Sequence, residues 1–65
     1  MNIYVNGAQQ AISANNVADT LAELGWQGAH VATAVNGTFV PHNERASTKL
    51  SEGDRLEVLT AMQGG

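Results

Sequence analysis

The chain has 65 residues, no cysteine and a formal net charge of −3, from three basic and six acidic side chains. A chain of this length forms one domain that buries only about 60% of its unfolded surface, so a deep catalytic cleft is not expected. The acidic balance argues against nucleic acid and anionic membranes, because both select clustered lysine and arginine. Without cysteine, the chain has neither a disulfide nor a thiol nucleophile.

The sequence shows no recognisable targeting segment. No apolar run approaches the roughly 20 residues of a membrane span. The first residues lack the basic region and the apolar stretch of a secretory signal. We therefore expect a cytoplasmic protein with no membrane partner.

The N-terminal segment predicts a β-hairpin. Ile3 and Val5 alternate with polar neighbours, which is the period-2 pattern of a half-buried strand. Asn6-Gly7 follows, and this dipeptide favours the two-residue turn of a hairpin. The return strand, residues 8–12, is polar in its middle, so we place it at the edge of a sheet.

A helix is predicted after this hairpin. Asn15-Asn16 is a helix-start signal, because an asparagine side chain can accept a hydrogen bond from an amide of the first turn. From Val17 onward, apolar residues recur at i, i+4 and i+7, which forms one apolar stripe. Gly25 suits a left-handed helix stop, and Trp26 after it is placed to fold back onto Leu21.

The second half predicts another hairpin, a crossing segment and a last strand. In chain order these are a strand at 31–35, a turn at Asn36-Gly37, a strand at 38–40 ended by Pro41, an irregular polar segment at 42–49 with room for one short helical turn, a turn at 51–54 and a strand at 55–61.

These elements predict an α+β fold of the β-grasp (ubiquitin-like) type over residues 1–61, with a flexible tail at 62–65. The sheet is expected to be mixed, with about five strands, and to be covered by one main helix. The last strand is expected beside the first, because one helix can then cover one face of a single sheet. The predicted core consists of Ile3, Val5, Val17, Leu21, Leu24, Val35, Leu56 and Val58.

The last residues of the chain are two glycines. Glycine lacks a Cβ and tolerates nearly any backbone angle, so such a tail can thread a narrow slot and present its carboxylate to an active site on another protein. Four extended residues reach roughly 13 Å. We therefore expect Gly65 to carry the reactive group, with Gly64, Gln63 and Met62 threading into the partner.

Three segments carry a resemblance to a known family. They are IYVNG at residues 3–7, AVNG at 34–37 with VP at 40–41, and EGDRLEV at 52–58 leading to QGG at 63–65. Together with the length, they resemble the ThiS family, the ubiquitin-like sulfur carriers of thiamine biosynthesis. Residues 27–30 and 42–49 contribute little to the resemblance.

The resemblance implies that the chain is a protein co-substrate and not an enzyme, with no cofactor of its own. A partner adenylyltransferase of the E1-like type would use ATP and magnesium to convert the Gly65 carboxylate to an acyl-adenylate. A persulfide on a sulfur-donor protein would displace AMP. The resulting thiocarboxylate at Gly65 would give its sulfur to a thiazole synthase that makes the thiazole moiety of thiamine.

The last strand also offers a docking surface beside the tail. Strand alternation places Leu59 and Ala61 on the same face as the charged Glu57, so both apolar side chains are expected to be exposed. We predict that Leu59, Ala61 and Glu57 contact the partner. Glu52 and Asp54 join Glu57 in an acidic group, which is either a solvated turn or a feature that steers a basic partner.

Two other groups favour structural roles. His30 and His42 are twelve residues apart without cysteine or closely spaced acids, so no metal site is expected. Trp26 and Phe39 could form a ligand platform, but packing in the core or at the helix end is the preferred interpretation. Three alternative functions remain open: a sulfur carrier for molybdopterin or another metabolite, a ubiquitin-like modifier of lysine, and an interaction module without tail chemistry.

Overall fold

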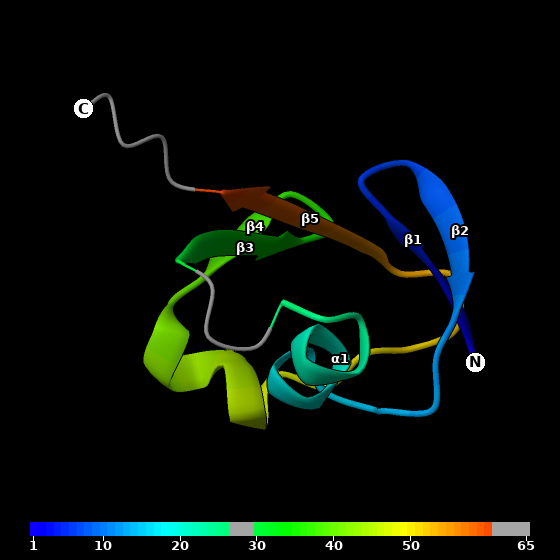
Figure 1. Cartoon of the computed structure of the whole chain (residues 1–65), viewed down its shortest axis with the longest axis horizontal. Helices are drawn as coiled ribbons and strands as arrows, with labels where there is room; N and C mark the ends of the chain where they lie inside the picture. The colour runs from blue at the N-terminus through cyan, green and yellow to red at the C-terminus, as the bar shows by residue number, and fades with distance from the viewer. Residues whose placement is uncertain (27–29, 61–65) are drawn as a thin grey trace.

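The computed structural model describes residues 1–26 and 30–60. Its elements are β1 Asn2–Val5, β2 Ala8–Ala11, α1 Val17–Glu23, β3 Val31–Val35, β4 Thr38–Val40, the 3₁₀ helix η1 His42–Ser47 and β5 Arg55–Thr60. The strands form one five-stranded sheet in the order β2-β1-β5-β3-β4. Helix α1 and η1 lie on the same side of this sheet (Figure 1). The predicted α+β, β-grasp architecture is confirmed.

Strand β5 lies at the centre of the sheet. It pairs in parallel with β1, where Val5 lies opposite Leu56, and antiparallel with β3, where Thr33 lies opposite Val58. The prediction that the last strand lies beside the first is therefore correct. Strand β2 is the exposed edge strand that its polar middle predicted, although it ends at Ala11, one residue earlier than expected.

The two asparagine–glycine turns reverse the chain, and their asparagine side chains also bond the backbone of β5. Asn6 and Asn36 have φ of 52° and 51°, and the glycine after each is also left-handed, as a two-residue hairpin turn requires. The Asn6 side chain also bonds both backbone groups of Val58, at 2.8 Å to the amide and 3.0 Å to the carbonyl. The Asn36 side chain accepts from the amide of Arg55 at 2.9 Å. Both hairpins thereby hold β5 in register.

Helix α1 begins and ends as the sequence predicted. Asn16 caps it by accepting from the Asp19 amide at 2.8 Å. At the other end, the Trp26 amide donates to Leu21 O at 2.8 Å and the Gly25 amide donates to Ala22 O at 3.2 Å. These two bonds form a Schellman motif around left-handed Gly25. The motif turns the indole back onto the core, against which it packs.

The core lies between α1 and the inner face of the sheet. Six predicted members are buried, whereas Leu24 and Val35 are half-buried and pack against them. Three buried apolar residues were not predicted: Ile12, Val40 and Leu50. Ile12 and Leu50 each stand alone beside polar stretches, so no periodic pattern marked them. Leu50 is brought in because the segment around it is tied to the start of α1, with its amide donating to Asn15 O at 2.9 Å.

The crossing segment is more ordered than the sequence indicated. The expected single helical turn is a six-residue 3₁₀ helix, η1, that begins directly after Pro41. Its Arg45 is buried, with 9% of its surface exposed. This burial was missed because a charged residue in a polar stretch is ordinarily expected to face solvent.

Candidate functional site

The predicted reactive tail lies outside the residues that the structure describes. This applies to the expected attachment residue, to the threading residues and to one docking residue; they are Gly65, Gly64, Gln63, Met62 and Ala61. Their roles, and the division between a domain at 1–61 and a tail at 62–65, stay predictions. The described part of the chain ends at Thr60, the last residue of β5.

Strand β5 shows the predicted division into two faces. Leu56 and Val58 are buried, whereas Glu57 and Leu59 are exposed on the opposite face. Leu59 exposes 67% of its surface, only one residue before the described chain ends. The predicted docking positions Leu59 and Glu57 are therefore accessible on the face of the sheet that points away from α1.

Neighbouring strands extend this exposed surface. Strand register places Ala32 opposite Leu59, and Ala34 between Glu57 and Phe39. Phe39 exposes 64% of its surface. We call Leu59, Ala32, Ala34 and Phe39 the apolar patch. Two alanines therefore lie between the two large side chains.

The position of Phe39 corrects one interpretation of the sequence. Packing in the core was preferred for both Trp26 and Phe39, and it holds only for Trp26. Val40 takes the inward position on β4, so its neighbour Phe39 points outward. The two aromatic rings thus lie on opposite sides of the sheet and form no common platform. The alternation within β4 was the signal that could have placed Phe39 in the apolar patch.

The acidic side chains near β5 differ in what they do. A Glu52 carboxylate oxygen accepts from the Asn2 amide at 3.0 Å. Asp54 accepts from the Ser51 amide at 2.8 Å and from the Asn36 side chain at 3.1 Å. Both acids therefore stabilise turns. Glu57 is exposed beside the apolar patch, where a contact with a basic group of a partner remains a prediction.

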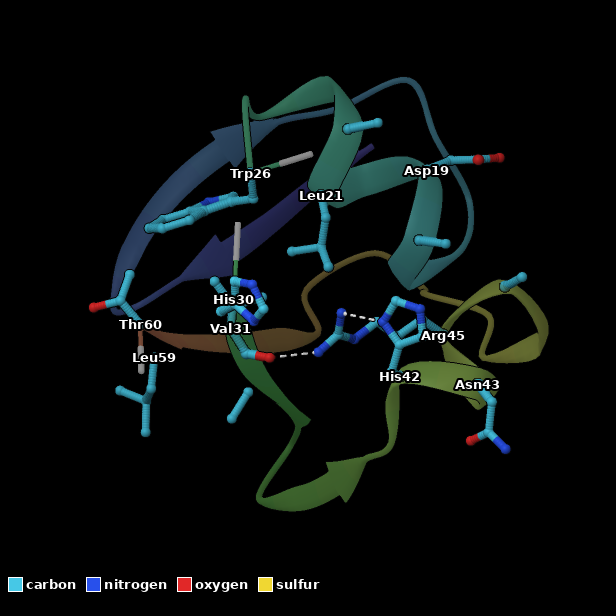
Figure 2. A pocket seen from close by; sticks show the side chains of 14 residues that line it. Asp19, Leu21, Trp26, His30, Val31, His42, Asn43, Arg45, Leu59 and Thr60 are labelled. Carbon is cyan, nitrogen blue, oxygen red and sulfur yellow. Dashed lines mark hydrogen bonds between the residues drawn. The ribbon is translucent and has the colours of Figure 1, made fainter. Parts of the chain in front are cut away.

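A hollow lies on the other side of the sheet, between α1, η1 and the adjoining ends of β3 and β5. Its walls include Leu21, Trp26 and Val31, and it reaches Leu59 and Thr60 at the end of β5. The Arg45 side chain projects into it beside His42 (Figure 2). The hollow was not predicted, because its walls come from segments that are distant in sequence.

Within residues 1–26 and 30–60, no group of three or more histidine, aspartate or glutamate side chains could hold a metal ion. His30 and His42 do both line the hollow, although they are twelve residues apart in sequence. Among the described helices, none is long and apolar enough to cross a membrane.

Two solved structures resemble this fold closely. The crystal structure of a thiamine biosynthesis protein (ThiS) from Geobacter metallireducens superposes with a TM-score of 0.83 at 30% sequence identity, and each chain is covered completely. A solution structure of a thiamine biosynthesis protein from the same organism gives a TM-score of 0.77 at 30% identity, covering 100% of this chain and 88% of that one.

Sequence comparisons point the same way. A thiazole synthase from Paramagnetospirillum magneticum is 32% identical over 66 residues, which is all of this chain but only 20% of that protein. The chain thus spans about a fifth of the length of this curated relative. The sequence profile of the ThiS family matches residues 3–65, which includes both terminal glycines. The chain belongs to the ThiS family.

Proposed function

We propose that this chain is the sulfur carrier of thiazole formation in thiamine biosynthesis, acting as a protein co-substrate in the cytoplasm. The main support for the proposal is the match to the ThiS family profile, which extends as far as Gly65. The relative named thiazole synthase supports the choice of a thiazole synthase as the sulfur acceptor. The molybdopterin and lysine-modifier alternatives have no comparable observation in their favour.

The proposed chemistry takes place at the Gly65 carboxylate. A carboxylate is a poor electrophile, so a partner adenylyltransferase of the E1-like type first joins it to AMP, using ATP and magnesium and releasing pyrophosphate. A cysteine persulfide of a donor protein then attacks the acyl carbon, and AMP leaves. Reduction of the resulting acyl disulfide by a thiol leaves a thiocarboxylate, whose sulfur is transferred to the thiazole synthase.

The chain contributes access and docking. Without Cβ atoms, Gly64 and Gly65 place no side chain next to the reacting carbon. The apolar patch lies on β5 and its neighbours, next to the point where the tail begins. A partner that covers the patch can therefore receive the tail in its active site. The lack of cysteine also means that no internal thiol competes for the activated acyl group.

Deletion of Gly65 tests whether the terminal carboxylate must stand at this position. We expect the shortened chain to lose sulfur transfer in the presence of the adenylyltransferase, the persulfide donor and the thiazole synthase. Its free energy of unfolding should be unchanged, because the deletion removes none of the core and strand residues found within 1–26 and 30–60. The measurements are thiazole formation and urea denaturation. A shortened chain that still transfers sulfur would refute the proposal.

A further inference from the structure

Arg45 is a buried cation whose described partners are all neutral. Its Nε donates to Thr33 Oγ1 at 3.2 Å, and its Nη2 donates to the backbone carbonyl of Val31 at 2.6 Å. Its Nη1 lies 3.1 Å from His42 Nδ1. Since a guanidinium only donates, His42 Nδ1 is the acceptor and the proton of the neutral ring is on Nε2. These bonds hold η1 against β3 but bring no negative charge.

Among the described residues, these three bonds leave the positive charge of Arg45 unpaired and part of its N–H donors unused. A guanidinium has five N–H groups, and the three bonds use one on each nitrogen. Within residues 1–26 and 30–60, Nη1 and Nη2 therefore each keep one N–H without a protein acceptor. Buried charges in proteins are ordinarily paired, because an isolated ion in a low-dielectric environment is costly. Two N–H groups on one guanidinium match the two oxygens of a carboxylate.

The surroundings favour an anion over other ligands. The hollow at Arg45 has apolar walls that include Leu21 and Trp26, and apolar walls strengthen a charge pair by excluding water. His30 and His42 add two imidazoles to the lining. Asp19 also lines the hollow, but its carboxylate bonds Asn16 at 3.0 Å and points away from Arg45 (Figure 2).

We propose that this hollow binds one carboxylate group, held by Nη1 and Nη2 of Arg45. The site lies between α1, η1 and the adjoining ends of β3 and β5, and it does not depend on the proposed sulfur transfer. The carboxylate has two possible sources. One is a free carboxylate in solution. The other is the carboxylate of Gly65, since Thr60 lines the same hollow and five extended residues reach roughly 17 Å.

The test is a titration of the ¹⁵N-labelled chain with sodium acetate, followed by NMR and compared with sodium chloride at equal ionic strength. We expect saturable shifts at Arg45 Nε–H and at the amides of Val31 and Thr33 with acetate only. Arg45→Gln should weaken acetate binding about tenfold or more, because it removes a charge-assisted bond. Arg55→Gln is the matched control: Arg55 is exposed, and its loss should leave binding unchanged.

The wild-type titration decides the proposal even if Arg45→Gln does not fold. Shifts that stay linear, or that chloride reproduces, overturn it, as does a folded Arg45→Gln chain that binds acetate as tightly as the wild type. A chain amidated at Gly65 separates the two sources. Tighter acetate binding after amidation identifies the Gly65 carboxylate as a competitor for the site, and equal binding identifies free carboxylate as the ligand.

Discussion

Thr20 and Thr33 are buried threonines with opposite hydrogen-bonding states, at 0% and 1% exposed. The Thr20 hydroxyl has no hydrogen-bond partner among the residues that the structure describes. The Thr33 hydroxyl donates to Val40 O at 2.9 Å and accepts from Arg45. A buried hydroxyl without a partner costs stability, whereas one that bonds two elements contributes to it. Thr33 thereby links β3, β4 and η1.

The same substitution at these two positions should act in opposite directions. Thr20→Val removes an unpaired hydroxyl at nearly constant volume, so we expect the free energy of unfolding to rise by about 1 kcal/mol. Thr33→Val removes the hydroxyl that donates to Val40 O and accepts from Arg45 Nε, so we expect a loss of about 1–3 kcal/mol. Urea denaturation of both variants provides the measurement. Equal effects would contradict the hydrogen-bond assignment.

Sequence reasoning at this scale found the residues that act through their backbone and missed those that act through distant side-chain bonds. Asn6 and Gly25 were placed correctly because a left-handed residue has a local signature. The bonds from Asn6 to Val58 could not be predicted, since they depend on the parallel pairing of β1 and β5. The burial of Arg45 is likewise a product of tertiary structure.

At the scale of elements, alternation located the strands and predicted the two faces of β5. It failed for η1, because a 3₁₀ helix of polar residues has no apolar period, and its position depends on the bonds of Arg45 to β3. The apolar patch was predicted only in its β5 part. Its β3 and β4 members follow from strand register, which the sequence does not state.

The patch yields a prediction about docking. Leu59→Asp places a charge on the more exposed of its two large side chains, so we expect a higher KM for the adenylyltransferase, by about tenfold or more, from the loss of an apolar contact with the partner. The fold should remain intact because the Leu59 side chain is largely exposed and does not belong to the core. Gln9→Asp on the edge strand β2 is the control, since it adds the same charge to another exposed strand. Equal adenylation kinetics in the two variants would exclude the patch from docking.

At the scale of the whole molecule, a small mixed sheet under one helix positions a central strand whose end leads into the tail. The fold and the family were both predictable, because the hairpin signals, the helix stop and the terminal motif agree with one another. The fold and the family do not by themselves establish the chemical role of the chain. A fold of this kind can be used in several ways, so the role of Gly65 must be tested by its chemistry.

The most direct test of the carrier proposal is the intact mass of the chain after incubation with the adenylyltransferase, ATP, magnesium and a persulfide source. The account predicts a gain that equals the replacement of one oxygen by sulfur, located in the peptide that ends at Gly65 and absent without ATP. No gain, under conditions in which the same enzymes convert another ThiS-family carrier, would contradict the proposed function.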